Sequence, residues 1–392
     1  MQTRKITADY VFDGQRLLKD TLLVLQQDGT VVELESTKNE DLSSVEVFKG
    51  ILTPGLINAH CHLELSHLKG AIGEKTGLPG FVSQVMRLRH FDKEEILAAI
   101  QTAEAEMWQS GIQAVGDICN TTDTLGQKEN SPIRYRNFVE CLGFLPWQAE
   151  QRFDAATQVC LALHAQNPAT TLVPHAPYSV SAELFKKINQ SVKEIPGAGE
   201  RIITMHNQES TPENEFFQSG TGAFIDFYKQ LGSDISFYSP SGKTSLQTVL
   251  PYIEAAQKLL LVHNTFTSGA DIAFSSRQSA LTGQSIYYVL CPGANLYIEN
   301  RLPDLAMLME AGVLIALGTD SLASNHSLSI AKEMQYLLRA YPDLDREQLL
   351  QWATYNGARA LGFETELGSI KKGLKPGIVL LSEQLEMVQR IF

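Results

Sequence analysis

The chain has few cysteines, and none of the five lies in a C-x-x-C pair. An odd number of dispersed cysteines does not fit a disulfide framework, so the sequence predicts a reducing, cytoplasmic environment. The same absence argues against a zinc site built from paired cysteines. The five residues are Cys61, Cys119, Cys141, Cys160 and Cys291.

Positive charge is also scarce, because 32 lysines and arginines stand against 44 acidic residues and leave a formal net charge of -12. This balance argues against nucleic acid or an anionic membrane as a partner. No apolar run approaches the roughly 20 residues of a membrane span, and the first residues lack the apolar core of a secretory signal. A hydrophobic content of 44% in 392 residues predicts a globular chain with one large domain, or a large and a small one.

Eight short apolar runs recur along the chain. Segments such as KEEILAAIQTAEAEMWQSG, with the 3.6-residue periodicity of amphipathic helices, separate most of them. Buried strands that alternate with helices predict an α/β fold with a parallel sheet, and eight repeats predict a (β/α)8 TIM barrel over residues 54–358. The runs are ILTPGLINAHCH, GIQAVGDICN, RNFVECLG, TLVPHAPYS, RIITMHNQES, LLLVHNTF, IYYVLCPGAN and VLIALGTDS.

Three segments do not fit the barrel pattern. DTLLVLQQDGTVVELES near the start and LGSIKKGLKPGIVLLSE near the end alternate like exposed strands, so we expect residues 1–53 and 359–392 to combine into a small β-sandwich. The Gly- and Ser-rich stretch from Gln230 to Ser245 predicts an elaborated loop over the barrel mouth, although a plain surface excursion would look the same.

Polar side chains follow nearly every apolar run. His60 and His62 lie two residues apart, so in a strand both imidazoles point to the same side and form half of a metal site. An isolated pair would more often be two surface histidines, but five of the nine histidines occupy strand ends, where a barrel has its active site. The polar residues are His60, His62, Asp117, Asn120, His175, His206, Glu209, His263, Asn295 and Asp320.

Four of these motifs, in this order, resemble the amidohydrolase superfamily in its nucleobase-deaminase branch. They are PGLINAHCH, HNQES, LVHNT and LGTDS, and the resemblance covers essentially the whole chain. The C-terminal segment, which would lead the chain back from the barrel into the small β-sandwich, departs from the family pattern. It has Pro376-Gly377 where Ala-Asp is usual. No lysine ends the fourth strand, where this chain has His175, so the resemblance implies one metal ion rather than a bridged pair.

Within that branch, HCHLELSHLKG, PHAPYSVS and GTDSLASN are most similar to aminodeoxyfutalosine deaminases. The resemblance implies hydrolysis of 6-amino-6-deoxyfutalosine to futalosine and ammonia, a step of menaquinone biosynthesis. Deaminases of adenosine, 5'-methylthioadenosine or S-adenosylhomocysteine remain an alternative. A hydrolase of another cyclic amidine or amide is more distant, because the lysine is missing. A non-catalytic binding protein on this fold should have lost a metal ligand or Glu209, and neither is lost.

The resemblance also implies roles for the strand-end residues. His60, His62, His206 and Asp320 would hold one divalent ion, Zn²⁺ first and Fe²⁺ as an alternative. Asp320 would also take a proton from water that the metal has acidified to a pKa of roughly 7. Glu209 would carry a proton to the purine ring nitrogen, unless it is only a helix N-terminal acid.

His263 would steady the tetrahedral intermediate, unless it is a fourth nitrogen ligand or a core histidine. The other expected substrate contacts are His175, Glu64, Ser66, His67, Ser321 and Asn325, each of which also has a structural interpretation.

The arginines Arg87, Arg89 and Arg301 are candidates for pairing with a substrate carboxylate, or else solvated surface charges. His90, His164 and His326 look like surface or helix residues. The expected partner is a small purine nucleoside, and a homodimer is left open.

Overall fold

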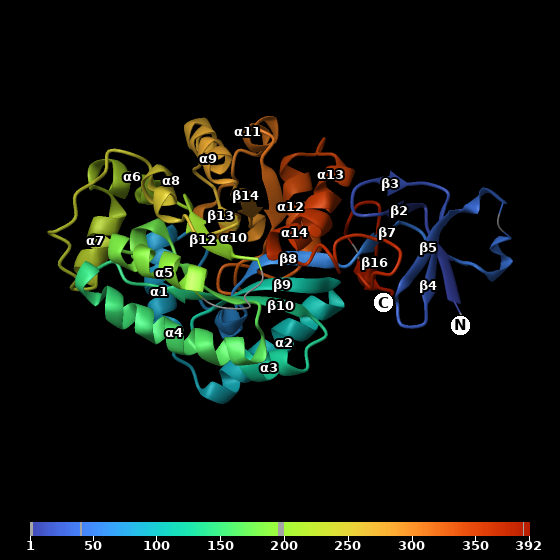
Figure 1. Ribbon diagram of the computed structural model, residues 1–392, viewed down its shortest axis with the longest axis horizontal. Helices are drawn as coiled ribbons and strands as arrows, with labels where there is room; N and C mark the ends of the chain where they lie inside the picture. Colours follow the sequence, from blue (N-terminus) through green and yellow to red (C-terminus); the bar gives the residue numbers. More distant parts are fainter. Residues whose placement is uncertain (1–2, 40, 195–199, 387) are drawn as a thin grey trace.

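A computed structural model describes residues 3–39, 41–194, 200–386 and 388–392 of the chain. Figure 1 shows a large body that contains the helices and, at one end of it, a smaller part made of strands. Both ends of the chain lie in or beside this smaller part (Figure 1). None of the helices in the described ranges is long and apolar enough to cross a membrane.

Two four-stranded parallel sheets form the interior of the large body, and each keeps its strands in chain order. Nearly every residue of these strands is buried, as expected for parallel sheets that helices cover. The first sheet contains β8 (Leu56–Cys61), β9 (Ile112–Cys119), β10 (Arg134–Cys141) and β11 (Thr170–Pro174). The second contains β12 (Ile202–Asn207), β13 (Lys258–His263), β14 (Ser285–Leu290) and β15 (Leu314–Leu317).

The two sheets meet at two narrow seams. At one seam the backbone N–H of His206 donates to the carbonyl oxygen of His175 over 2.9 Å. At the other, Cys61 and Asp320 form an isolated parallel bridge, and the Asp320 N–H donates to His60 O over 3.1 Å. The strand pairing therefore does not confirm one continuous eight-stranded barrel, but both seams lie at the histidines and the aspartate of the predicted metal site.

Helices follow most of the buried strands and pack around the two sheets (Figure 1). Their ends use ordinary capping chemistry: Ser268 and Asp271 form a capping box on α9, and Gly220 ends α6 in the left-handed conformation. The helices are α1 (Leu78–Leu88), α2 (Lys93–Gln109), α3 (Leu125–Glu129), α4 (Ala149–Gln166), α5 (Ala182–Glu194), α6 (Thr211–Ser219), α7 (Ala223–Gln230), α8 (Ser245–Val249), α9 (Gly269–Thr282), α10 (Pro292–Glu299), α11 (Leu305–Glu310), α12 (Ile330–Ala340), α13 (Arg346–Gln351) and α14 (Gly357–Leu361).

The long loop expected from Gln230 to Ser245 lies between α7 and α8, and no residue from 231 to 244 belongs to a helix or strand. Two of its residues, Leu231 and Ser233, line the main cavity of the large body. The loop therefore borders the mouth of this cavity, as its Gly- and Ser-rich composition had suggested.

The smaller part contains two sheets, one of four and one of five strands. In the five-stranded sheet, β16 pairs with β7, so segments from both ends of the chain share it. Side chains of both sheets, including Ile6, Leu23, Leu52 and Ile378, form a second apolar cluster. The ends thus associate as expected, whereas the β-sandwich description and the boundaries at residues 53 and 359 stay predictions. The strands are β1 (Thr3–Thr7), β2 (Tyr10–Phe12), β3 (Leu17–Leu18), β4 (Thr21–Gln26), β5 (Val31–Ser36), β6 (Glu46–Val47), β7 (Ile51–Pro54), β16 (Ile378–Leu381) and β17 (Val388–Arg390).

Candidate active site and metal centre

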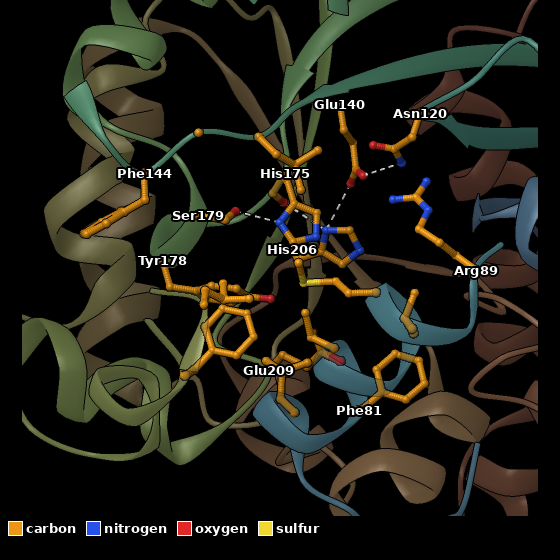
Figure 2. A pocket seen from close by; sticks show the side chains of 18 of the residues that line it. Phe81, Arg89, Asn120, Glu140, Phe144, His175, Tyr178, Ser179, His206 and Glu209 are labelled. Atoms are coloured by element: carbon orange, nitrogen blue, oxygen red, sulfur yellow. Dashed lines mark hydrogen bonds and ion pairs between the residues drawn. The ribbon is translucent and has the colours of Figure 1, made fainter. Parts of the chain in front are cut away.

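A cavity of about 420 Å³ lies where the carboxyl ends of the buried strands converge. Figure 2 shows that His175, His206 and Glu209, which come from three separate places in the chain, point into one space. The polar residues that line it are His62, Glu64, Asn120, Glu140, His175, Ser179, His206, Glu209, His263, Asp320 and Ser321.

The four predicted metal ligands lie close together at one side of this cavity. His62 Nε2 is 3.3 Å from Asp320 Oδ1 and 3.2 Å from His206 Nε2. His60 Nε2 is 3.6 Å from Asp320 Oδ1. Ligand atoms of His60, His206, His263 and Asp320 all lie within 4.8 Å of one another, and those of His62, Glu140 and His206 form a second group of this kind.

The donor atoms of this cluster fit a bound cation. Both ring nitrogens of His60 and Nε2 of His263 are buried without a hydrogen-bond partner among the described residues. Burial lowers the pKa of His62 to about 3 and that of His263 to about 4, so these rings are neutral and offer lone pairs. Burial alone would raise the pKa of Asp320, but the nearby His60, His62 and His263 rings hold it well below its usual range. Neutral imidazoles around an ionised carboxylate are typical ligands of Zn²⁺ or Fe²⁺.

Hydrogen bonds behind the cluster fix which nitrogen of each ring faces inward. His206 Nδ1 donates to the carbonyl oxygen of His175 over 2.9 Å, which leaves Nε2 as the free lone pair. His263 Nδ1 lies 2.8 Å from Asn295 Oδ1, so its Nε2 faces the cavity. These outer partners hold the imidazoles in the tautomers that metal binding or hydrogen bonding at Nε2 needs.

Backbone strain is concentrated at the same strand ends. Gln208, His263, Asn264 and Asp320 have φ values of 45°, 75°, 57° and 59°, in the left-handed region that residues other than glycine seldom adopt. Such conformations cost of order 1–3 kcal/mol each and persist where the surroundings impose them. Of these four residues, His263 and Asp320 line the cavity.

Glu209 lies beside the metal cluster and is almost fully buried. Its Oε2 is 3.6 Å from His263 Nε2. Burial, together with the charges of Asp320 and Glu213, raises its pKa well above the ordinary value. A carboxyl group that stays protonated near neutrality can deliver a proton to a basic ring nitrogen.

Only some of the predicted substrate contacts reach this cavity. His175 and Ser321 line it, and His175 Nδ1 lies 2.6 Å from Ser179 Oγ (Figure 2). Glu64 also lines it, but its Oε2 accepts three hydrogen bonds from the backbone of Asn120 and from Thr121. That carboxylate is therefore held rigidly in the cavity wall.

Three predicted contacts lie elsewhere. The Ser66 hydroxyl turns back and donates to Leu63 O over 2.7 Å, because its short helix directs it to the backbone. His67 lines a separate cavity of about 510 Å³ and packs edge-on against Phe91. Asn325 donates to Thr319 O and to Glu333 Oε1, so it stabilises the loop after β15 instead of facing the site.

Of the three arginines considered, only Arg89 lines the main cavity. Figure 2 shows its guanidinium pointing towards Asn120 and Glu140. Among the described residues, the Arg89 guanidinium has no hydrogen-bond partner and no ion-pair partner within 4 Å. Arg87 is exposed in the last turn of α1. The guanidinium of Arg301 stacks 4.7 Å from the ring centroid of Phe266.

Sequence reasoning missed two features of the site. Glu140 ends β10 beside His206, with its Oε1 3.4 Å from His206 Nδ1, and burial raises its pKa to about 8. It is the only acid in the run RNFVECLG, which was the available signal. The second feature is an apolar lobe of the cavity, whose residues are Leu65, Leu78, Phe81, Val82, Val85, Met86, Leu142, Phe144, Leu145, Phe227, Tyr228 and Leu231.

The amidohydrolase family profile matches residues 51–390, so the chain belongs to the amidohydrolase family. The protein is a hydrolase that acts on C–N bonds, and its relatives include nucleoside deaminases. Its fold is thus of the TIM-barrel type found in that family, with mixed α and β content. The resemblance drawn from the four strand-end motifs is confirmed.

Individual relatives agree with this class but carry different substrate names. An adenosine deaminase of Helicobacter pylori is 28% identical over 317 residues, which cover 79% of this chain and 74% of that protein. An aminodeoxyfutalosine deaminase of Deinococcus radiodurans is 28% identical over 331 residues, or 80% and 74% of the two chains. The solved structure of Helicobacter pylori aminofutalosine deaminase in complex with methylthio-coformycin is similar at a TM-score of 0.80 and 25% identity, over 97% of this chain and 92% of that one.

Proposed function

We propose that the protein is a metal-dependent deaminase of a 6-aminopurine nucleoside, with 6-amino-6-deoxyfutalosine as its substrate and futalosine and ammonia as its products. The observation that carries the reaction class is the convergence of the His60, His62, His206 and Asp320 ligand atoms with a buried carboxyl group, Glu209, in one cavity. A bound divalent ion, Zn²⁺ first, would supply a water molecule that ionises near neutrality.

The side chains of this chain supply the remaining chemistry. Glu209, which burial keeps protonated, gives its proton to the ring nitrogen beside the amino carbon, and that carbon becomes more electrophilic. Asp320, which stays ionised, accepts a proton from the attacking water. His263 donates from Nδ1 to Asn295 Oδ1, so its Nε2 accepts a hydrogen bond from the new hydroxyl group on the ring. Asp320 then gives this proton to the amine, which leaves as ammonia, and the proton of the new hydroxyl group returns to Glu209 as the ring carbonyl forms.

The shape of the cavity supports a substrate with an apolar and acidic group at the 5' position. The apolar lobe formed by α1, α7 and the 142–145 segment belongs to the same cavity as the ligand atoms. Arg89 stands in the wall of this cavity without an ion-pair partner among the described residues, and a guanidinium pairs readily with a carboxylate. The benzoate-bearing chain of 6-amino-6-deoxyfutalosine would place a ring in this lobe and a carboxylate within reach of Arg89.

A direct substrate comparison tests this proposal. Purified protein is given 6-amino-6-deoxyfutalosine, adenosine, 5'-methylthioadenosine and S-adenosylhomocysteine, and the ultraviolet change from adenine to hypoxanthine is followed. We expect kcat/KM for the first substrate to exceed the others more than about tenfold, because one buried carboxylate contact contributes roughly 2–5 kcal/mol. Equal or better turnover of S-adenosylhomocysteine or adenosine would move the assignment to that substrate. If none of the four nucleosides is turned over, the proposed deaminase activity is wrong.

A further inference from the structure

The position of Glu209 is set by its backbone. Glu209 lies in the short connection between β12, which ends at Asn207, and α6, which begins at Thr211. The residue before it, Gln208, has a φ of 45°, a left-handed conformation that is strained for a glutamine. Something in the surroundings must therefore hold this turn.

The carboxylate of Glu213 contacts both amides of this turn. Glu213 comes from the first turn of α6 and is fully buried. The Gln208 N–H donates to its Oε1 over 2.9 Å, and the Glu209 N–H donates to its Oε2 over 3.2 Å. Each carboxylate oxygen thus holds one of two consecutive backbone amides.

This arrangement departs from ordinary helix capping. The sequence Ser210-Thr211-Pro212-Glu213 has the spacing of a capping box, in which the glutamate would bond the N-cap backbone. The N-cap residue Ser210 makes no side-chain capping bond, and the Glu213 oxygens reach the two residues before it instead. The Glu213 carboxylate therefore does not cap its own helix. It accepts hydrogen bonds from the turn that carries Glu209.

Gln208 is held from its other sides as well. Its carbonyl oxygen accepts a hydrogen bond from the Phe266 N–H over 2.9 Å. Its side chain donates to Asp271 Oδ2 and accepts from the Thr267 hydroxyl. The backbone before Glu209 is therefore anchored, whereas the Glu209 side chain has no such anchor and lines the cavity.

We propose that Glu213 is a positioning residue, which fixes the Gln208–Glu209 backbone so that the Glu209 carboxyl group meets the ring of the substrate. This inference rests on the proposed deaminase function. Misplacing a catalytic group by about 1 Å can reduce turnover about 100-fold, so a loosened turn should slow the chemical step and leave substrate binding nearly unchanged.

The test uses Glu213→Gln and Glu213→Ala. The glutamine keeps the shape but turns an NH₂ group towards one of the two N–H donors, so one of the two bonds is lost. The alanine loses both. We expect kcat to fall about tenfold or more in Glu213→Gln and about 100-fold in Glu213→Ala. KM and the metal content should stay within about threefold of the parent.

Glu104→Gln is the matched control. Glu104 is another buried carboxylate, lies on α2 away from the cavity, and accepts a hydrogen bond from the Tyr135 hydroxyl over 2.9 Å. It should keep kcat within about threefold of the parent even where it lowers the melting temperature. If the Glu213 variants lose no more activity than this control does, the positioning role is wrong.

A second measurement needs no substrate. Amide hydrogen exchange, resolved at single residues, should become at least about tenfold faster at Gln208 and Glu209 in Glu213→Ala. The His206 amide, which donates to His175 O, serves as the internal reference and should not change. Unchanged exchange at the two amides would overturn the proposal. A parent enzyme that turns over no aminopurine would refute the proposed function alone, because exchange still measures the Glu213 contacts.

Discussion

Glu209 combines burial with closeness to the metal ligands, and its predicted role depends on that combination. Glu209→Gln keeps the size of the side chain but removes the exchangeable proton. We expect kcat to fall about 10²–10⁴-fold, the usual contribution of a general acid, while the metal content stays at the parent level. Steady-state kinetics and metal analysis check this. Activity within a few-fold of the parent would leave Glu209 as a helix N-terminal acid only.

Arg87, in the last turn of α1, and Arg89, the C-cap residue that follows this helix, offer a matched pair, since only Arg89 lines the cavity. Arg89→Gln should lower kcat/KM for 6-amino-6-deoxyfutalosine by more than about tenfold, because the carboxylate loses its partner. The same variant should leave kcat/KM for adenosine nearly unchanged, since adenosine has no carboxylate. Arg87→Gln should affect neither substrate. Equal losses on both substrates in Arg89→Gln would mean that Arg89 supports the cavity wall and not the substrate acid.

The histidines at the strand ends could be placed together from the sequence, whereas several of their neighbours could not. Each strand carries its last residues and those directly after it to the same end of the sheet, so the gathering of His60, His62, His206 and Asp320 follows from strand order. Ser66 lies in a short helix and Asn325 in a loop, where local hydrogen bonds to Leu63 and Thr319 decide the direction of the side chain. No periodicity encodes such bonds.

At the scale of elements, α12 is linked to its surroundings by one buried carboxylate. Glu333 accepts hydrogen bonds from the Gly293 N–H of α10 and from Asn325 in the loop after β15, over 2.7 and 2.8 Å. Burial raises the pKa of Glu333 to about 8, and the two hydrogen bonds only partly oppose this. The group that joins α12 to α10 and to the loop after β15 is therefore a carboxyl group that folding favours in its protonated form.

The stability of the protein should depend on pH through Glu333. Its folded pKa lies above the unfolded value, so the folded chain binds the extra proton and loses stability as pH rises from about 4.5 to about 8. Glu333→Gln cannot ionise and lacks this contribution. The unfolding free energy of the parent minus that of the variant should therefore fall between pH 5 and pH 8.5 in urea titrations. If parent minus variant stays constant, or rises towards pH 8.5, the assignment is wrong.

The elements themselves were easier to predict than their connections. Each of the eight apolar runs overlaps one of the strands β8 to β15, because a strand buried on both faces is mostly apolar. The apolar lobe was missed because α1, α7 and the 142–145 segment come together only through tertiary packing. The sequence named Arg89 as one of three candidate carboxylate partners, and only tertiary packing singles it out as the one that lines the cavity.

At the scale of the whole molecule, the metal cluster joins the two four-stranded parallel sheets. His60 and His62 come from the end of β8 in the first sheet, and His206 and Asp320 come from the ends of β12 and β15 in the second. Metal analysis should give about one divalent ion per chain. Removing it with a chelator should abolish activity and lower the melting temperature, since a ligand that binds only the folded state stabilises it. Adding one equivalent of Zn²⁺ should restore both. Full activity in a folded, completely chelated sample would exclude the metal mechanism.

The pairing of β7 with β16 has a consequence for how the chain is made. Thr53 pairs with Val379, so the five-stranded sheet joins residues that leave the ribosome at nearly opposite ends of synthesis. At translation rates of about 5–20 residues per second, β7 would wait on the order of tens of seconds for its neighbour. During that time it presents an unpaired edge, a site where nascent strands associate wrongly. The smaller part of the molecule is therefore expected to fold last, although its first strands are synthesised before the rest of the protein.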